Sequence, residues 1–159
     1  MEILSAADIK TVDQETMAAQ QISSSELMER AAMALVIALW DQGLIRQGHT
    51  HHIGFICGSG NNGGDGLAMA RILHGQGFQT TVWHAQVGNP SPDNQLMSDR
   101  LPSEIEYHRV AEGDGLSHVD FTSTDIVIDA LFGVGLTRPI TGYWAKLVDC
   151  CNEQSKHCS

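Results

Sequence analysis

A glycine-rich segment, GSGNNGGDG at residues 58–66, contains the residue types that most clearly suggest chemistry. It follows an apolar stretch and precedes a helical pattern, and Gly58, Gly60 and Gly63 have the G-x-G-x-x-G spacing. Glycines in this context allow backbone N–H groups at the start of a helix to converge on an anion. The segment therefore predicts a site for an anionic phosphate. The alternative is a turn that needs glycine only for its positive φ angles.

This segment departs from two familiar phosphate-binding loops. No Gly-Lys-Ser/Thr sequence follows it, which excludes a P-loop. A dinucleotide-binding fingerprint needs an acidic residue at the end of the second strand to hold a ribose. TTVWHAQVG at 80–88 offers only His84 there, which disfavours the interpretation as an NAD-dependent dehydrogenase.

Two carboxylates stand out near these glycines. Asp129 lies at the end of an apolar stretch, where a half-buried carboxylate is either functional or braces a loop or helix end. Asp65 is expected to open the helix after the first loop, where it can cap that helix or reach ribose hydroxyls. An Asn amide oxygen, a carboxylate and backbone carbonyls would together suit a hard cation. Residue types alone leave potassium, sodium, magnesium and calcium open.

The elements that must position these residues alternate between helical and strand patterns. Ser5 and the Ser23-x-x-Glu26 capping box predict the starts of two helices. Leu27, Ala31, Leu35 and Leu39 form an apolar stripe on the second helix, assigned to the core or to a dimer surface. Strands are predicted at 52–57, 80–85, 105–110 and 125–133, and helices at 6–20, 67–77, within 89–102 and at 142–154.

This alternation predicts an α/β fold with a parallel sheet covered by helices on both faces. Such sheets bind ligands outside the carboxyl ends of their strands. The glycine-rich segment and the loop that contains Gly133 and Gly135 both fall at such ends, so we expect the two loops to form one site.

Three segments resemble the YjeF N-terminal domain family, which has the NAD(P)H-hydrate epimerase fold. GSGNNGGDGLAMAR is similar to the family's signature, LMERAAMAL (27–35) to its N-terminal helix, and DIVIDALFGVGLTRPITG (125–142) to its second loop. The three blocks have the family's order and spacing and extend over nearly the whole chain. The resemblance implies a three-layer α/β/α sandwich of Rossmann-like type with a mostly parallel sheet.

The resemblance also implies an isomerase of nicotinamide nucleotide repair, which interconverts the R and S forms of hydrated NADH and NADPH (NADHX and NADPHX). An ADP- or ATP-dependent dehydratase, as a domain or separate protein, would then repair the S form. Asp129 would be catalytic, and Asn62 and Asp129 would bind potassium. The implied substrate-binding residues come from both loops: Asn61, Asn62, Gly63, Gly64, Asp65, Gly133, Val134, Gly135, Leu136, Thr137, Arg138 and Pro139. The residue type alone favours a solvated loop charge for Arg138.

The chemistry of that reaction agrees with the residues present. The hydrated carbon of the substrate is a hemiaminal, so its hydroxyl must leave and return on the other face, or the ring must open and close. Either route needs proton transfer and stabilisation of separated charge, and neither needs a redox cofactor.

The family continues with another strand and an Asp-x-Pro-Ser-Gly segment that supplies further substrate and potassium ligands, and no such segment occurs here. We therefore expect residues 1–159 to form one epimerase-like domain, truncated at its C-terminal end. Some relatives of this fold act as non-catalytic nucleotide-binding or protein-interaction modules, which is the alternative function. The intact GSGNNGGDG segment and Asp129 favour the enzyme.

Composition limits the partners and the compartment. Nine Lys+Arg against nineteen Asp+Glu give a net charge of −10, which disfavours nucleic acid. The longest apolar run, residues 31–40, is shorter than the roughly 20 residues that a membrane-spanning helix needs. No signal peptide is visible. We expect a cytoplasmic protein without a membrane partner, with a homodimer as its candidate assembly.

Cysteine and histidine spacing predicts neither disulfides nor a zinc site. Cys57 lies in an apolar run, and Cys150, Cys151 and Cys158 cluster near the end without a CxxC pair, so we interpret all four as reduced thiols. The histidines at 49, 51 and 52 fit no zinc pattern and are interpreted as solvated loop residues.

Overall fold

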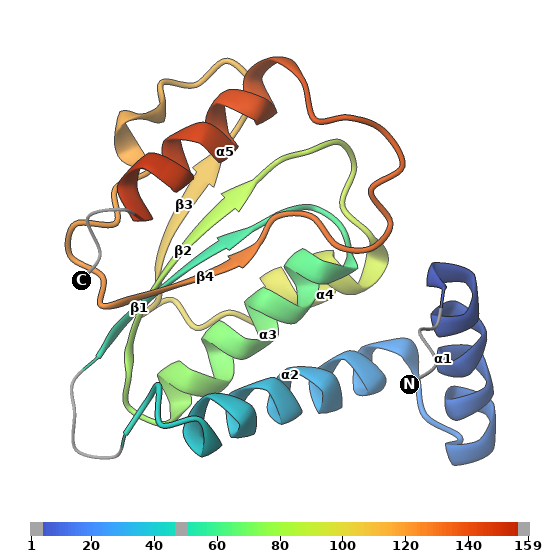
Figure 1. Cartoon of the computed structure of the whole chain (residues 1–159). Coiled ribbons are helices and arrows are strands. Elements are labelled where there is room, and N and C mark those ends of the chain that lie inside the picture. Colours follow the sequence, from blue (N-terminus) through green and yellow to red (C-terminus); the bar gives the residue numbers. More distant parts are fainter. Residues whose placement is uncertain (1–4, 47–50, 156–159) are drawn as a thin grey trace.

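The computed structural model describes residues 5–46 and 51–155, in which helices and strands alternate as predicted (Figure 1). The elements are α1 (Ala6–Gln20), α2 (Ser24–Asp41), β1 (His52–Cys57), α3 (Asn61–Gly75), β2 (Gln79–Ala85), α4 (Pro92–Asp99), β3 (Glu106–Val110), a 3₁₀ turn η1 (Leu116–His118), β4 (Ile126–Ala130) and α5 (Gly142–Ser155). Each predicted strand and helix is present, although α3 begins earlier and β4 ends earlier than the sequence pattern indicates.

The four strands form a parallel sheet in the order β3-β2-β1-β4. Helices α2, α3 and α4 cover one face, and α5 covers the other (Figure 1). The predicted three-layer α/β/α sandwich is therefore confirmed. Since all strands run in the same direction, their carboxyl ends meet at one edge of the sheet, where both predicted loops begin.

Strand β1 lies between β2 and β4 and is buried along its whole length. Ile53 and Phe55 pack toward α2 and α3, whereas Ile56 packs toward α5. This two-sided burial explains the nearly continuous apolar run of β1, which is typical of an inner parallel strand.

The predicted capping box at Ser23 is present, and Ser5, predicted only as an N-cap, forms a second capping box with Asp8. The backbone N–H of Ser5 donates to Asp8 Oδ2 at 2.9 Å, and that of Ser23 donates to Glu26 Oε2 at 2.8 Å. The predicted apolar stripe of α2, assigned to the core or to a dimer surface, is only partly in the core, since Leu27 and Leu39 are half-buried. The buried residues of α2 are Met28, Ala32 and Val36, whereas Ala31 and Leu35 are exposed. The apolar arc of this helix is wider than the face that α3 and α4 cover, so the sequence could not indicate which part is buried.

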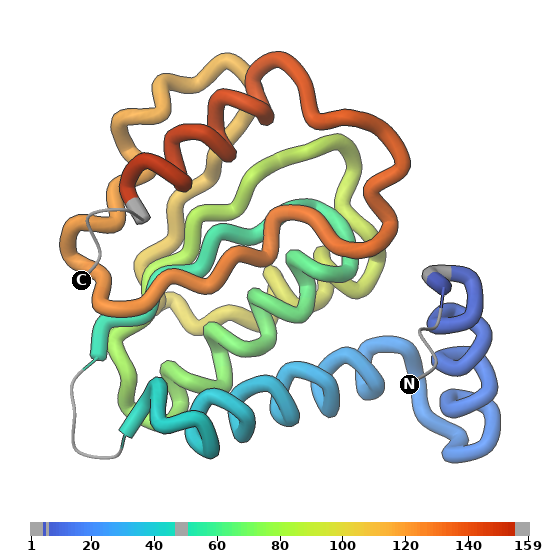
Figure 2. The backbone as a smooth tube through the Cα atoms, viewed as in Figure 1, coloured from blue at the N-terminus to red at the C-terminus, as the bar shows by residue number. Residues whose placement is uncertain are grey.

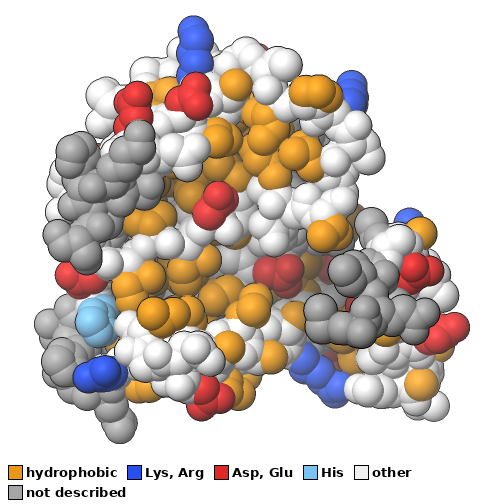
Figure 3. Space-filling view, in the orientation of Figure 1, with side chains coloured by type: hydrophobic (Ala, Val, Ile, Leu, Met, Phe, Trp, Pro, Cys, Tyr) orange, Lys and Arg blue, Asp and Glu red, His pale blue; other side chains and the backbone are white. Residues whose placement is uncertain are grey.

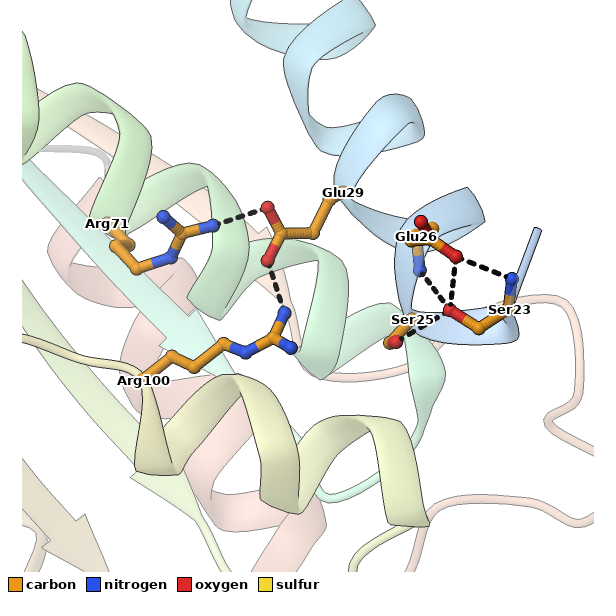
Figure 4. Close-up of polar contacts among 6 residues, drawn as sticks. All are labelled: Ser23, Ser25, Glu26, Glu29, Arg71 and Arg100. Carbon is orange, nitrogen blue, oxygen red and sulfur yellow. Dashed lines mark hydrogen bonds and ion pairs between the residues drawn. The ribbon is translucent and has the colours of Figure 1, made fainter.

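Glu29 of α2 links three helices on one side of the sheet (Figure 4). Its Oε2 lies 2.6 Å from Arg71 Nη2 of α3, and its Oε1 lies 2.6 Å from Arg100 Nη1, directly after α4. All three side chains are partly shielded from solvent. The carboxylate therefore fixes α2 against the helix that begins with the glycine-rich segment.

We expect Glu29→Gln to lower the free energy of unfolding by about 1 kcal/mol, because both arginines lose their charged partner. Urea unfolding monitored by circular dichroism measures this loss. Glu15→Gln is the matched control, since Glu15 is exposed on α1 and has no ion pair within the described residues. High salt should reduce the difference between the two variants. Equal losses in both would contradict a stabilising role for Glu29.

The interpretation of His52 as a solvated loop residue is wrong. His52 is the buried first residue of β1, with Nδ1 2.8 Å from Ser123 O and Nε2 2.8 Å from Thr81 Oγ1. Its partners come from β2 and from the segment before β4, so only the strand order reveals them. His51 is half-buried, with Nδ1 4.0 Å from Asp125 Oδ2, and His49 lies outside the described residues.

Cys57, Cys150 and Cys151 are free thiols, and Cys158 lies outside the described residues. Burial raises the pKa of Cys57 far above its ordinary value and raises that of Cys151 to about 12. These two thiols are therefore poor nucleophiles at neutral pH. In the described part of the chain, no helix has both the length and the apolar character needed to cross a membrane.

Candidate functional site

The segments that follow β1 and β4 meet through backbone contacts at the carboxyl edge of the sheet (Figure 2). The N–H of Gly58 donates to the carbonyl of Ala130 at 3.0 Å. A Cβ at position 58 would lie only 2.0 Å from the carbonyl oxygen of Leu131. Because Gly58 has no side chain, the two chain segments approach more closely there than any other residue would allow.

The first loop is shorter than the sequence predicts. Helix α3 begins at Asn61 with Gly60 as its N-cap, so residues 61–66 are helical and the predicted loop over 58–66 is wrong in that part. No side chain caps the helix, and the first backbone N–H groups of an α-helix have no partner within the helix. The N-terminus of α3 therefore presents free donors and the positive end of its dipole to an anion.

Close packing explains the glycines of this segment, and positive φ angles do not. None of the glycines at positions 58–66 has a positive φ, so the alternative of a simple turn is wrong. A Cβ at Gly63 would lie 1.8 Å from the carbonyl oxygen of Gly58, and one at Gly64 would lie 2.7 Å from the sulfur of Met28. The glycines allow the start of α3 to lie against both the strand end and α2.

Asn62 connects the start of α3 to the second loop. Its side chain is half-buried, and its Nδ2 donates to the carbonyl of Phe132 at 3.3 Å. A Cβ at Gly133 would lie 3.0 Å from that of Asn62. Since Nδ2 is used in this contact, Oδ1 of Asn62 remains available as a ligand atom. Its neighbour Asn61 is exposed at the first position of the helix.

Asp129 is more exposed than its position in an apolar strand predicts. Its Oδ1 accepts a 2.9 Å hydrogen bond from the N–H of Leu131, so the carboxylate does brace the start of the second loop. The expectation of a half-buried side chain is wrong because β4 lies at the edge of the described sheet. A carboxylate that is held at one oxygen and open to solvent at the other is suited to accept or deliver a proton.

The remaining residues of the second loop extend into solvent. Strand β4 ends at Ala130, so the strand predicted through residue 133 is too long. All of the predicted binding residues of this loop are exposed: Gly133, Val134, Gly135, Leu136, Thr137, Arg138 and Pro139. Val134 has an exposed fraction of 74%, which is high for an apolar side chain. The exposure of Arg138 agrees with a solvated loop charge.

Asp65 lies one turn inside α3, so the expectation that it opens this helix is wrong. Its side chain is half-buried and makes no hydrogen bond within residues 5–46 and 51–155. Burial, with a smaller contribution from Asp13 of α1, raises the pKa of Asp65 from 3.8 to about 6. The folded chain thus holds an under-solvated carboxylate beside the candidate anion site.

We expect Asp65→Asn to stabilise the protein by about 1 kcal/mol at pH 7, a value reduced for partial solvent screening. Because the folded-state pKa is raised, the stability linked to Asp65 is fully present below pH 3.8 and is lost as pH rises to about 6. Urea unfolding at pH 4 and pH 7 should therefore show a benefit only at the higher pH. Asp41→Asn, at the exposed end of α2, is the control. A benefit of equal size at both pH values would contradict this assignment.

Two residues that carry no signal in the sequence hold the turn before α3. Asn94 of α4 donates from Nδ2 to the carbonyls of Gly58 and Gly60, at 2.8 and 2.9 Å. Ser59 donates from Oγ to the carbonyl of Ala85 at 3.1 Å. The sequence Ser91-Pro92 indicates the start of α4. It does not indicate the contact between Asn94 and Gly58, which are more than thirty residues apart.

The described residues contain no group of three or more His, Cys, Asp or Glu side chains placed to hold a metal ion. The predicted pair of Asn62 and Asp129 offers an amide oxygen and a carboxylate. These two donors are of the type that hard cations prefer, and they leave further ligands to backbone oxygens or water.

The sequence matches the family described as YjeF-related protein N-terminus over residues 24–159. The chain belongs to this family. A Rhodobacter capsulatus protein named NAD(P)H-hydrate epimerase is 37% identical over 147 residues, which cover 89% of this chain and 66% of that protein. A Leuconostoc citreum protein of the same name is 31% identical over 161 residues, covering 98% of this chain and 66% of its own. The chain thus spans just under two thirds of these YjeF-related relatives.

A solved structure supports the fold of this YjeF-related domain. The crystal structure of yeast ynu0 (YNL200c) superposes with a TM-score of 0.78 at 24% sequence identity, covering 98% of this chain and 67% of the yeast chain. The similarity extends beyond the family match to nearly the whole chain. The resemblance drawn from the three sequence blocks is confirmed.

Proposed function

We propose that this chain is an NAD(P)H-hydrate epimerase domain, which interconverts the R and S forms of hydrated NADH and NADPH. The observation that carries the proposal is the contact between the start of α3 and the second loop. It brings Asn62 against Phe132 and Gly133, directly after the strand that holds Asp129. The curated relatives named NAD(P)H-hydrate epimerase support this assignment.

Asp129 is the proposed proton carrier. Departure of the hemiaminal hydroxyl needs a proton, and return of water on the opposite face releases one. The N–H of Leu131 holds one carboxylate oxygen, which gives the exposed side chain a defined orientation at the start of the second loop. The nicotinamide ring would lie beside this carboxylate.

The N-terminus of α3 is the proposed site for the anionic part of the substrate. Backbone N–H groups of Asn61, Asn62 and Gly63 lie in the first turn and are free to donate to phosphate. Asp65, one turn further, would repel phosphate and is better suited to ribose hydroxyls. The second loop from Gly133 to Pro139 would close over the ligand, with Thr137 and Arg138 near its phosphates.

We further propose that Asn62 Oδ1 and Asp129 hold a potassium ion. The donor set is all oxygen, and the nitrogen of the Asn62 amide is already bonded to Phe132. When bound, the cation would offset the charge of the carboxylate and tie the two loops together. The oxygen donors of Asn62 and Asp129 are of the kind that bind such an ion.

The proposed partner is an ADP- or ATP-dependent dehydratase that consumes the S form, in the cytoplasm. A homodimer remains part of this proposal. A non-catalytic nucleotide-binding module is the second candidate, favoured by the solvent exposure of residues 133–139 in the second loop.

One coupled assay tests the proposed function. The protein is mixed with epimeric hydrated NADH and an S-specific dehydratase, and recovery of NADH is followed by absorbance. An epimerase makes the R form disappear faster than its spontaneous rate. Heat-denatured protein is the control. Persistence of the R form at the spontaneous rate would reject the enzyme, and retained binding of NADPH measured by calorimetry would then support the non-catalytic module.

A further inference from the structure

A buried polar pair, His84 and Asn94, lies behind the turn that precedes α3. Asn94 is fully buried and His84 has an exposed fraction of 4%. The two donors of the Asn94 amide bond the carbonyls of Gly58 and Gly60, one on each side of the turn. Asn94 therefore fixes the backbone of this turn directly.

His84 lies near the end of β2, in register with Cys57 of β1, and has the Asn94 side chain and the Gly58 carbonyl as neighbours. Its Nδ1 is 2.7 Å from the hydroxyl of Tyr107 on β3. Its Nε2 and the Oδ1 of Asn94 are both buried and have no hydrogen-bond partner within the described residues. A small movement that pairs these two atoms would satisfy both of them, which is what buried polar groups generally require.

The charge and tautomer of His84 follow from its surroundings. Desolvation lowers the pKa of His84 more than the neighbouring Asn94 amide and Gly58 carbonyl raise it, so the imidazole is neutral at neutral pH. Burial raises the pKa of Tyr107, which therefore remains a protonated donor. Tyr107 can donate to Nδ1, which leaves the N–H on Nε2 to face Asn94.

The orientation of the Asn94 amide is determined by the same contacts. Rotation of the amide by half a turn would place Oδ1 against two carbonyl oxygens and would lose both bonds to the turn. A hydrogen bond from His84 Nε2 to Oδ1 of Asn94 would stabilise only the observed orientation of the amide. Hydrogen bonds thus join Tyr107 to His84 and Asn94 to the turn, and His84 and Asn94 are neighbours between them.

We propose that Asn94 and His84 are positioning residues for the substrate site, since they hold the Gly58–Gly60 turn so that the first N–H groups of α3 face the ligand. Their effect on the turn is a property of the free protein, whereas their effect on substrate rests on the proposed function. Neither residue contacts the substrate, and both act through the backbone of the turn.

Amide hydrogen exchange measured by NMR tests the positioning role without any ligand. The informative amides are those of Gly58 and Gly64, which donate to Ala130 O and Gly60 O. We expect Asn94→Ala to accelerate their exchange about tenfold, as the loss of buried hydrogen bonds predicts. The matched control is Asn89→Ala, an exposed residue in the loop before α4. Unchanged exchange in folded Asn94→Ala would overturn the proposal.

The coupled epimerase assay gives a second readout. We expect Asn94→Ala to raise KM for R-hydrated NADH about tenfold with a smaller change in kcat, because binding N–H groups lose their alignment. His84→Leu should raise KM by a smaller factor. His84→Gln, which keeps a neutral donor, should bring KM back to the wild-type value. Equal behaviour of His84→Leu and His84→Gln in both assays would remove His84 from the proposal.

The two proposals can fail separately. If the wild-type protein shows no epimerase activity, the proposed function fails, and the exchange rates still decide whether Asn94 and His84 position the turn. If Asn94→Ala does not fold, the exchange rates and KM of His84→Leu and His84→Gln decide whether this buried pair positions the turn. Wild-type activity together with unchanged exchange and unchanged KM in these variants would overturn the positioning role alone.

Discussion

Gly63→Ala is expected to lower the free energy of unfolding by about 3 kcal/mol, at the upper end of what overpacking usually costs. The new Cβ would lie 1.8 Å from the carbonyl oxygen of Gly58 and 2.6 Å from its carbonyl carbon. These are backbone atoms, which cannot rotate away as a flexible side chain can. The start of α3 must therefore move from the end of β1, and the contact between the two loops weakens with it.

Urea unfolding of Gly63→Ala and Gly60→Ala measures this effect under matched conditions. Gly60 is the control because it lies in the same segment and has a φ of −84°, and a methyl group there would have no neighbouring atom within 4 Å. Its replacement should cost no more than about 1 kcal/mol, since only the N-cap preference for Gly over Ala is lost. Comparable losses in the two variants would show that the close approach of Gly63 to Gly58 does not limit this site.

Asp129→Asn is expected to lower kcat of the proposed epimerase by about 10²- to 10⁴-fold, the usual contribution of a general acid–base group. The amide can still accept the hydrogen bond from the N–H of Leu131, so the loop keeps its brace. It cannot exchange a proton with the substrate hydroxyl. Stability should therefore change little while turnover falls.

The coupled dehydratase assay measures the loss, and urea unfolding confirms that the fold is retained. Asp149→Asn, on the exposed face of α5, is the matched control and should keep wild-type activity. Asp129→Ala should lose both activity and some stability, since it also removes the bond to Leu131. Full activity in Asp129→Asn would exclude this carboxylate as the proton carrier.

The sequence predicts the layers of this fold because their signals are local. Strand β1 shows as a continuous apolar run, and the capping boxes at Ser5 and Ser23 mark where two helices begin. The positions of His52 and Asp129 depend instead on which strands are neighbours. His52 is buried by partners from β2 and the segment before β4, and Asp129 is exposed because β4 occupies the edge of the described sheet.

The candidate site could be located from the sequence, but its construction could not. The glycine-rich segment and Asp129 are evident from spacing and from their position after apolar strands. Position 63 requires glycine because it lies against the carbonyl group of Gly58. Asn94 acts through a hydrogen bond that it donates from α4 to the carbonyl of Gly58. Neither contact leaves a pattern in the adjacent residues, so a sequence without its structure cannot reveal them.

The edge position of β4 has a consequence for handling the protein. Within the described residues β4 pairs with β1 alone, so one side of its backbone has N–H and C=O groups that no strand satisfies. Half-buried Ile126, Val127 and Ile128 lie on this strand, and apolar side chains gather on the same face of the molecule (Figure 3). Within the described residues this edge is open to pairing with a further strand, of the same chain or of another molecule. Concentrated solutions of residues 1–159 should therefore scatter light through intermolecular association before the interior of the domain unfolds.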